Sequence, residues 1–303
     1  MDITTFEGLA RVAAGRAERA VLAVALAEDA HTLEAVVRAR REGVADAVLI
    51  GDDARIRAML AELGAAEDFE IVPAVTEDAA LGMMVDLVRS RRANAVMKGR
   101  LESADFLRAI LARENGLRGE GKLSLIGFYE TRGYHKLFAV TDMGVNTTPD
   151  LAGKREILEN AAALLRRMGV AMPKIAVLSE SERVNAKIPA SVDADALKKL
   201  WAAGEITGCV VEGPIAFDLA TSAEAAAIKG YASPVAGDAD LLLVPDIVAG
   251  NILVKCLTGF AGARTAGTIL GARLPVVMTS RSAEAEDKFY SIALAAIAAG
   301  AVR

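Results

Sequence analysis

The sequence has few of the residues that cross-link a protein or bind metal ions. Among its 303 residues only two are cysteines, Cys209 and Cys256, and each stands alone in an apolar run without CxxC spacing. We therefore expect no structural disulfide, and this cysteine usage is typical of a reducing compartment. The two histidines, His31 and His135, lie far apart in the sequence, so they do not predict a zinc site or a catalytic triad.

Long apolar runs and blocks of basic charge are also missing. No stretch of 18 apolar residues occurs, and the amphipathic first 20 residues carry acids and lack the uninterrupted apolar region of a signal peptide. We therefore expect a soluble, cytoplasmic protein. The formal net charge is −5, with Lys and Arg scattered along the chain, which argues against a nucleic-acid surface but allows one local anion pocket.

Standard nucleotide-binding motifs are absent as well. The segment LIGDDARI lacks the G-x-G-x-x-G turn of a dinucleotide site, and no G-x-x-x-x-G-K-[ST] motif occurs anywhere in the chain. NAD sites and P-loop sites of the standard kind are therefore unsupported.

What the sequence has in abundance is aliphatic residues. Apolar residues make up 53% of the chain and aromatics only 4%, a composition typical of helices packed on a buried sheet. Short runs rich in Val, Ile and Leu alternate with segments of helical period, which predicts βαβ units and a mostly parallel sheet. The expected strands are 20–26, 46–51, 69–74, 94–99, 123–129, 136–142, 174–179, 208–213, 239–246 and 274–279. The expected helices are about 30–43, 53–64, 77–92, 102–114, 151–168, 192–203, 216–228, 249–260 and 284–300.

The length of the chain favours two domains or one large α/β unit. The polar segment 143–150, which contains Gly144, Asn146 and Pro149, is the expected domain boundary. The direct step from strand 123–129 to strand 136–142 predicts a hairpin at a sheet edge. The last strand and the last helix fit either sheet.

Ligands bind parallel sheets beyond the carboxyl ends of the strands, so polar residues there are candidates for a site. Helix starts favour Ser, Gly and Asp by themselves, but a cation is disfavoured at the positive end of a helix unless an anion is bound there. The arginines Arg100, Arg108 and Arg281 therefore point to a multiply charged ligand. Other polar residues after these strands include Lys98, Ser103 and Ser280.

The stretch VVMTSRSAEAEDKF, residues 276–289, has two interpretations. Ser280 is a favoured N-cap residue and acids suit a first helical turn, so one interpretation is a plain helix start. The other interpretation is that the stretch forms part of a catalytic site.

Six segments in order along the chain resemble the phosphate acetyl/butyryltransferases. They are VMKGRLESADFLR, TDMGVNTTPDL, LSESERVNAKIPASVDA, VEGPIAFDLA, SPVAGDADLLLVPDIVAGNILVKCL and TSRSAEAEDKF. The resemblance runs from about residue 15 to the C-terminus, and VPDIVAGN and TSRSAEAED match the most characteristic stretches. VNAKIPASVDA and VEGPIAFDLA are closer to the butyryltransferase branch, or to the acyltransferase half of certain enoyl-CoA hydratase fusions. Many of the acetyltransferases have LSRG where this chain has TSRS, and this departure bears on the acyl preference more than on the chemistry.

The resemblance implies two α/β domains with a cleft between them, related to the isocitrate and isopropylmalate dehydrogenases. The first domain would comprise residues 1–145 and about 270–303, and the second residues 146–269. The implied protein is a homodimer or larger oligomer that moves an acetyl or butyryl group reversibly between coenzyme A and phosphate. It would need no cofactor, metal or covalent intermediate, with coenzyme A acting as a substrate.

The resemblance also implies roles for particular residues. The catalytic Ser-Arg pair falls on Ser280 and Arg281, and the family's aspartate seven positions after the serine falls on Asp287. We expect Asp287 to deprotonate the thiol, because a thiol of pKa near 8.5 is mostly protonated at neutral pH. Arg281 would hold the phosphoryl oxygens, and Ser280 would bond the sulfur or the oxyanion.

Substrate binding is expected from residues after other strands. Arg108 matches a family arginine, while a second substrate arginine has two candidates, Arg118 and Arg132. In PDIVAGN, Gly250 would allow a close backbone approach and Asn251 would offer an amide to a nucleotide or pantetheine arm; the alternative is a plain αL turn and cap. The full set of expected substrate-binding residues is Arg108, Lys98, Ser103, Asp246, Gly250 and Asn251.

Two other functions stay open at this point. One is a dehydrogenase on the related fold, which is disfavoured because no acidic metal cluster of that kind follows these strands. The other is a non-catalytic module that binds coenzyme A or a nucleotide. The presence of Ser280, Arg281 and Asp287 argues against the second alternative.

Overall fold

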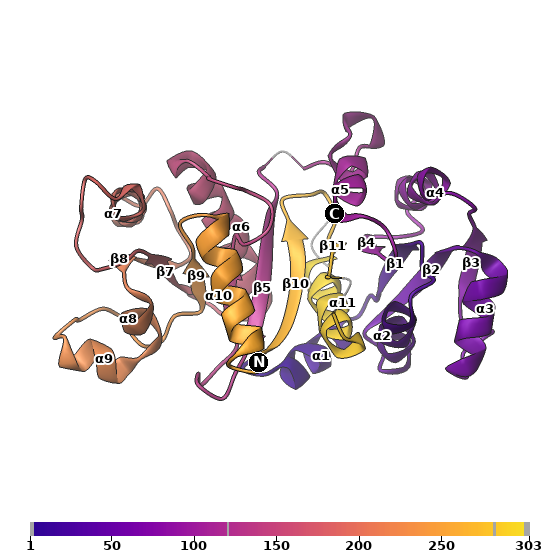
Figure 1. Ribbon diagram of the computed structural model, residues 1–303, viewed down its shortest axis with the longest axis horizontal. Helices are drawn as coiled ribbons and strands as arrows, with labels where there is room; N and C mark the ends of the chain where they lie inside the picture. Colours follow the sequence, from indigo (N-terminus) through magenta and orange to yellow (C-terminus); the bar gives the residue numbers. More distant parts are fainter. Residues whose placement is uncertain (1–2, 120, 281–282, 300–303) are drawn as a thin grey trace. The chain divides into compact units, whose positions relative to one another are not determined.

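The chain divides into two compact units (Figure 1), and the computed structural model describes residues 3–119, 121–280 and 283–299. Unit 1 comprises Met1–Thr5 and Gly121–Thr265, and unit 2 comprises Phe6–Glu120 and Ala266–Arg303. Among the helices in these described ranges, none is both long enough and apolar enough to cross a membrane.

The sheet of unit 2 has the strand order β3-β2-β1-β4-β11-β10. All of its strand pairs are parallel except the pair formed by β10 and β11. Parallel pairing follows from the helical crossovers that connect β1 to β4 along the chain. The strands are β1 (Ala20–Ala25), β2 (Ala45–Gly51), β3 (Glu70–Pro73), β4 (Ala95–Lys98), β10 (Arg264–Leu270) and β11 (Val276–Val277).

The helices of unit 2 cover both faces of this sheet. Helix α11 packs against α1 and α2, and its side chains from Lys288 to Ala299 are all buried. Figure 1 shows α2 and α11 on one side of the strands and α4 on the other. The helices are α1 (Phe6–Ala14), α2 (Ala30–Arg41), α3 (Asp53–Glu62), α4 (Glu77–Arg89), α5 (Ser103–Leu111) and α11 (Ala285–Ala299), with a 3-10 turn at Arg113–Asn115.

The sheet of unit 1 has the strand order β5-β6-β9-β7-β8. The first two strands form an antiparallel hairpin, which confirms the predicted hairpin but not its predicted position at a sheet edge, and the other pairs are parallel. The strands are β5 (Ser124–Glu130), β6 (Phe138–Thr141), β7 (Lys174–Leu178), β8 (Val210–Ile215) and β9 (Leu241–Leu243).

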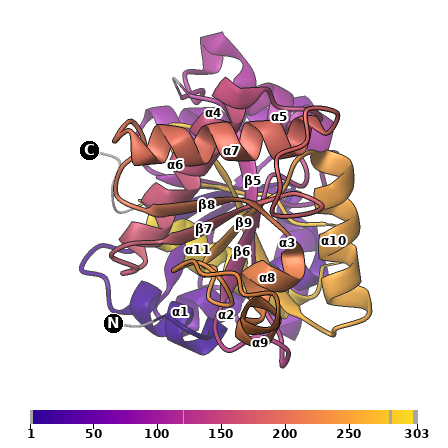
Figure 2. The same cartoon turned by 90° about the vertical axis from the view of Figure 1, so that its left-hand side faces the viewer.

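Figure 2 shows α6 and α7 on one side of these strands and α8 and α9 on the other. The core on the second side includes Phe138 and Leu242 from the sheet, together with Leu219 and Leu257 from the helices. Burial of such side chains removes apolar area from water and stabilises the layered arrangement. The helices are α6 (Leu151–Arg167), α7 (Pro189–Ala202), α8 (Phe217–Thr221), α9 (Ala223–Ile228) and α10 (Ile247–Gly259).

The mostly parallel α/β class is confirmed, but the boundary between the units lies at residues 120 and 121 instead of at 145 and 146. Residues 121–145 belong to unit 1 because β5 pairs with β6 and β6 pairs with β9, as in the register of Ala139 with Leu241. The chain returns to unit 2 at Ala266, close to the expected position of about 270. Strand β10 was missed because its sequence, RTAGTIL, lacks a continuous run of branched aliphatic residues.

Candidate active site

The carboxyl ends of three neighbouring parallel strands meet in unit 2, since β4 pairs with β1 on one side and with β11 on the other. A pocket of about 80 Å³ lies at this edge. One water molecule occupies roughly 30 Å³ in the liquid, so the pocket has room for a group of a few heavy atoms. It is lined by Asp29, Lys98, Gly99, Arg100, Thr279, Ser280 and Lys288. The structure therefore brings Ser280 and Lys98, both predicted site residues, together.

The wall of this pocket depends on a close approach of two chain segments. A Cβ atom at Gly99 would lie 2.0 Å from the carbonyl oxygen of Leu26, so a side chain at position 99 is excluded. The amide of Gly99 donates to the carbonyl of Ala25 at 2.9 Å, and the amide of Arg100 donates to that of Leu26 at 2.8 Å. Leu26 has a φ of 53°, which is uncommon for a residue other than glycine. These contacts place Arg100 at the pocket.

Two lysines with buried side chains line the same pocket. Lys98 is 4% exposed, and its Nζ atom donates to the carbonyl of Leu101 at 2.9 Å. Lys288 is also 4% exposed, and its Nζ atom donates to Asp29 Oδ1 at 2.5 Å and to Thr32 Oγ1 at 3.0 Å. Buried ammonium groups are costly unless they are paired, so these contacts are needed to keep both lysines in place.

The Asp29 carboxylate is ionised through the same contacts. Burial by itself would raise the pKa of Asp29, but the hydrogen bonds from Lys288 and Thr32 outweigh burial and hold that pKa below its usual value. Asp29 is also the N-cap of α2 and accepts from the amide of Thr32 at 2.8 Å. One carboxylate thus caps a helix and anchors a buried lysine.

The chain that follows Ser280 is held by α2. The amide of Ala283 donates to the carbonyl of Ser280 at 3.1 Å, and His31 Nδ1 donates to the carbonyl of Ala283 at 3.1 Å. The carboxylate of Glu284 lies 3.7 Å from His31 Nε2. His31 lies in the first turn of α2, and its contacts with Ala283 and Glu284 support the segment next to Ser280. Arg281, the predicted phosphoryl ligand, lies outside the described residues.

Asp287, the predicted base, lies in the first turn of α11 and does not line the pocket of Ser280. Its neighbour Lys288 does. Sequence reasoning selected the aspartate and missed the lysine. A usable signal was present, because Lys288 is the only charged residue between Asp287 and the described end of α11 at Ala299. A lone charge in an apolar helix is seldom buried without a partner.

Arg108 lies elsewhere in unit 2. It projects from α5, which begins at Ser103, and it pairs with Asp105 while its side chain stays 74% exposed. A separate groove of about 690 Å³ contains it, together with residues of α4 such as Arg89. Arg108 does not line the pocket that holds Ser280.

The two candidates for a second substrate arginine lie in different units. Arg118, in unit 2, is exposed, and its backbone bridges to Ala272. Arg132, in unit 1, is exposed in the turn that leads from β5 into β6. It therefore lies near the amino end of β6, at the sheet edge opposite to the carboxyl ends of unit 1.

The other predicted binding residues surround the start of α10 in unit 1. Asp246 is the N-cap, and its Oδ1 atom accepts from the amide of Ala249 at 2.9 Å, while Asn251 is exposed. Gly250 lies within the helix, where an added Cβ would be 2.8 Å from Val244 Cγ2 and 2.9 Å from Met143 Cβ. The close approach at Gly250 is therefore to the protein itself, and the residue does not form an αL turn.

A buried carboxylate that sequence reasoning did not single out organises the same edge. Asp142 follows β6 and is 3% exposed. Its Oδ1 atom accepts from the amides of Leu125, Gly144 and Val145 at 3.0 to 3.2 Å, and its Oδ2 atom accepts from the amide of Asn146 at 3.0 Å. The loop in the segment TDMGVN is thus built around one side chain.

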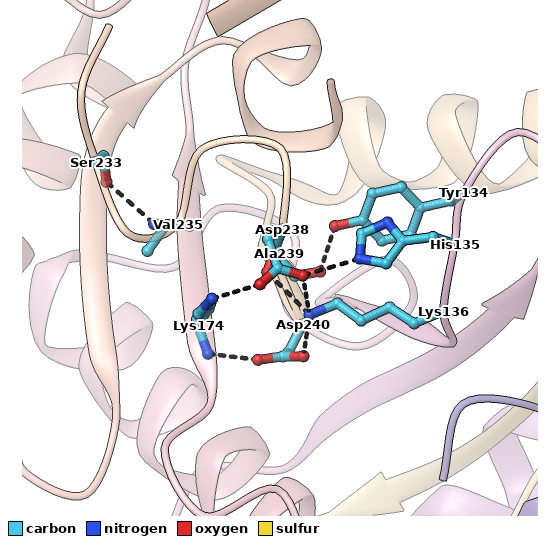
Figure 3. Close-up of polar contacts among 9 residues, drawn as sticks. All are labelled: Tyr134, His135, Lys136, Lys174, Ser233, Val235, Asp238, Ala239 and Asp240. Atoms are coloured by element: carbon cyan, nitrogen blue, oxygen red, sulfur yellow. Dashed lines mark hydrogen bonds and ion pairs between the residues drawn. The ribbon is translucent and has the colours of Figure 1, made fainter. Parts of the chain in front are cut away.

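The opposite edge of unit 1 carries an ion network (Figure 3). Lys136 donates to Asp240 Oδ1 at 2.6 Å and pairs with Asp238 at 2.7 Å, and Lys174 pairs with the other oxygen of Asp238. His135 Nε2 donates to Asp238 Oδ1 at 2.9 Å. Burial would raise the pKa of Asp238, but the hydrogen bonds from Lys136, Lys174 and His135 outweigh it and hold that pKa far below its usual range. Lys136 precedes β6, Asp238 and Asp240 precede β9, and Lys174 is the first residue of β7, so the network ties together the amino ends of three strands.

Within residues 3–119, 121–280 and 283–299, no three His, Cys, Asp or Glu side chains are arranged to hold a metal ion.

Comparison with known proteins gives consistent results at the levels of family and fold. The family model described as phosphate acetyl/butaryl transferase matches residues 68–296. The chain is 41% identical over 280 residues to a phosphate butyryltransferase of Clostridium acetobutylicum, covering 92% of this chain and 93% of that protein. It is 39% identical over 292 residues to a phosphate acetyltransferase of Thermotoga maritima, covering 96% of this chain and 98% of that protein.

Solved structures give the same result. A branched-chain phosphotransacylase from Enterococcus faecalis superposes with a TM-score of 0.81 at 33% identity, covering 92% of this chain and 99% of that one. A putative 4-hydroxythreonine-4-phosphate dehydrogenase from Salmonella typhimurium, at a TM-score of 0.57 and 15% identity, shows a shared fold alone.

Proposed function

The chain belongs to the phosphate acetyl/butaryl transferase family, and we propose on this premise that it transfers a short acyl group reversibly between coenzyme A and phosphate. The finer parts of the proposal are that the acyl group is butyryl or acetyl, and that the enzyme works in the cytoplasm as a homodimer or larger oligomer. The relatives carry both acyl names at nearly equal identity, 41% and 39%, so identity alone does not rank the two acyl groups.

The observation that carries the proposal is the pocket at Ser280. It is small, it lies at the carboxyl ends of parallel strands, and it combines a hydroxyl with the cations Lys98, Arg100 and Lys288. A phosphoryl group is small and doubly charged, and cations with fixed positions stabilise it best where water is largely excluded. The site chemistry therefore suits an acyl phosphate.

In the direction of thioester synthesis, the thiol sulfur of coenzyme A attacks the carbonyl carbon of the acyl phosphate. A carbon–sulfur bond forms, the bond from carbon to the bridging oxygen breaks, and phosphate leaves with the electron pair. We assign the thiol proton to Asp287, the phosphoryl oxygens to Arg281, and the sulfur or the developing oxyanion to Ser280. Orientation of two bound substrates supplies further acceleration without a covalent enzyme intermediate.

Binding of the remainder of coenzyme A is assigned to residues outside the pocket. Arg108 and Ser103 of α5 are assigned to the charged part of the substrates. Asp246 and Asn251 at the start of α10 are assigned to the nucleotide or pantetheine arm. The exposure of Arg108 and Asn251 supports these assignments, since both side chains are accessible to a ligand.

The test is whether the protein forms a thioester from coenzyme A and acetyl phosphate or butyryl phosphate. The absorbance of the thioester is used to monitor the reaction. We expect turnover with both and a higher kcat/KM for one of them. Parallel assays with magnesium, NAD and a 2-hydroxy acid test the dehydrogenase alternative. Binding of coenzyme A without turnover on any acyl phosphate would instead support a non-catalytic binding module.

A further inference from the structure

We propose that Lys288 is a second phosphoryl-binding cation of this site, held at the pocket of Ser280 by Asp29 and Thr32. The inference rests on the proposed acyl transfer to phosphate and adds a residue that the family resemblance did not supply. Its ligand is the phosphate dianion, either free or as the phosphoryl end of an acyl phosphate.

The charges that line the pocket favour a dianion. Among the described residues that line the pocket, Lys98, Arg100 and Lys288 are cations and Asp29 is the one carboxylate, so this part of the lining is positively charged. Phosphate groups carry about −1.5 to −2 charges at neutral pH. The described lining of the pocket and the ligand are therefore opposite in charge, and the volume of about 80 Å³ suits a group of this size.

The hydrogen bonds of Lys288 leave capacity for a ligand. An ammonium group has three N–H donors. Within the described part of the chain, the Nζ atom of Lys288 donates to Asp29 Oδ1 and to Thr32 Oγ1, and both contacts come from the first turn of α2. The remaining donor belongs to a buried group that lines the pocket, where an anion would satisfy it.

The position of Lys288 in the fold makes it a rigid ligand. It is the fourth residue of α11, and the side chains that follow it in this helix are buried against the core. Asp29 and Thr32 immobilise its head group from a second helix, so little rotamer entropy would be lost when phosphate binds. A pre-organised cation of this kind is more effective than an exposed, mobile lysine.

The competing explanation is purely structural, since the pair of Lys288 with Asp29 also joins α11 to α2. The two explanations differ in what happens when both charges are removed. Loss of one partner leaves an uncompensated buried charge and destabilises the fold, whereas removal of both can restore stability. The proposed contact of Lys288 with phosphate would be lost in every variant that lacks the lysine, whether or not stability is restored.

The experiment compares Lys288→Met, Asp29→Asn and the double variant in the reaction of acyl-CoA with inorganic phosphate. Lys199→Met is the control, because Lys199 is an exposed lysine paired with an aspartate on a helix of unit 1. We expect Lys288→Met to raise the KM for phosphate by about 10- to 100-fold, as for loss of one charge-assisted hydrogen bond. The dissociation constant of coenzyme A, measured by calorimetry, should change by less than about threefold, since Lys288 is assigned to phosphate and not to coenzyme A.

The double variant decides between the explanations. We expect it to regain thermal stability relative to Lys288→Met while keeping the high KM for phosphate, and we expect Asp29→Asn alone to leave that KM nearly unchanged. Recovery of the KM together with stability, or equal defects in the two single variants, would overturn the assignment. A wild-type chain that forms no thioester would instead overturn the proposed function itself.

Discussion

At the residue scale, Asp287 and Lys288 are neighbours with different surroundings, and their roles can be separated. Asp287→Asn keeps the shape of the side chain but removes the proton acceptor. If Asp287 deprotonates the thiol, thioester synthesis should fall by roughly 10²- to 10⁴-fold near neutral pH. The loss should shrink as the pH rises toward about 8.5, because the free thiolate then becomes abundant.

The measurement is a pH profile of kcat/KM for the wild type and the variant. A deficit of constant size across the profile would indicate misplaced substrate instead of a lost base. An unchanged rate at every pH would show that Asp287 is an ordinary charge at the start of a helix, where its effect on stability is a few tenths of a kcal/mol.

A second prediction at the residue scale concerns Arg281. Arg281→Ala should lower kcat far more than it weakens coenzyme A binding, because its assigned partner is the phosphoryl group in the transition state. Arg281→Lys should rescue little, since an ammonium cannot form the planar two-pronged contact of a guanidinium. Arg57→Ala, which removes an exposed arginine of α3, is the control. Normal kcat in a folded Arg281→Ala variant would remove this residue from the mechanism.

Gly250 tests packing at a single position. An alanine Cβ there would lie within 3.0 Å of Val244 and of Met143, so we expect Gly250→Ala to cost about 1–3 kcal/mol of unfolding free energy from overpacking. Gly82→Ala is the matched control, because Gly82 is also within a helix but no atom lies within 4 Å of the added methyl group. The control should gain up to about 1 kcal/mol from helix propensity. Urea unfolding measures both, and a stabilised Gly250→Ala would contradict the packing argument.

At the scale of the element, the N-cap of α10 has one observed role, in capping the helix, and one proposed role, in substrate binding. Asp246→Ala removes the bond to the amide of Ala249 and should cost about 1 kcal/mol of unfolding free energy. Asp246→Asn retains a good cap while removing the charge. A capping role alone therefore predicts near-normal stability and a normal KM for coenzyme A in the asparagine variant.

We expect instead that Asp246→Asn keeps its stability but has an altered KM for coenzyme A, because the proposal places this side chain at the substrate. Asp52→Ala, which removes the N-cap of α3, controls for cap loss at another helix. A normal KM in Asp246→Asn would limit the residue to capping.

At the scale of the whole molecule, the ion network in unit 1 predicts how stability depends on pH. The folded-state pKa of Asp238 is held below its unfolded value by Lys136, Lys174 and His135. A carboxylate of this kind contributes stability that is present above the unfolded pKa of about 3.9 and is lost as the pH falls toward the folded pKa. We expect the unfolding free energy of the wild type to decline below about pH 4 more steeply than that of Asp238→Asn.

Chemical unfolding at a series of pH values between about 2.5 and 7 checks this prediction. The difference between the wild type and Asp238→Asn should be largest at neutral pH and should shrink on acidification. Two curves that stay parallel over this range would show that the network does not bias the ionisation of Asp238.

The order of most helices and strands, and two of the residues that line the pocket, were predictable from the sequence. Aliphatic runs with turn signals define strands, and intervening segments of helical period define helices, so local pattern was enough for the α/β class and the β5–β6 hairpin. The rule that ligands bind at the carboxyl ends of parallel strands selected Lys98 and Ser280, which do line one pocket. Strand β10 escaped this approach because its polar and small residues carry no such pattern.

Other features depend on contacts between distant segments, and only the tertiary structure decided them. The boundary between the units is set by the pairing of β5, β6 and β9, a non-local choice that a polar segment at 143–150 does not reveal. Successive helical residues point about 100° apart, so which of Asp287 and Lys288 reaches the pocket depends on how α11 packs against α2. The sequence by itself determined which residue types follow each strand, whereas packing determined which of their side chains share a site.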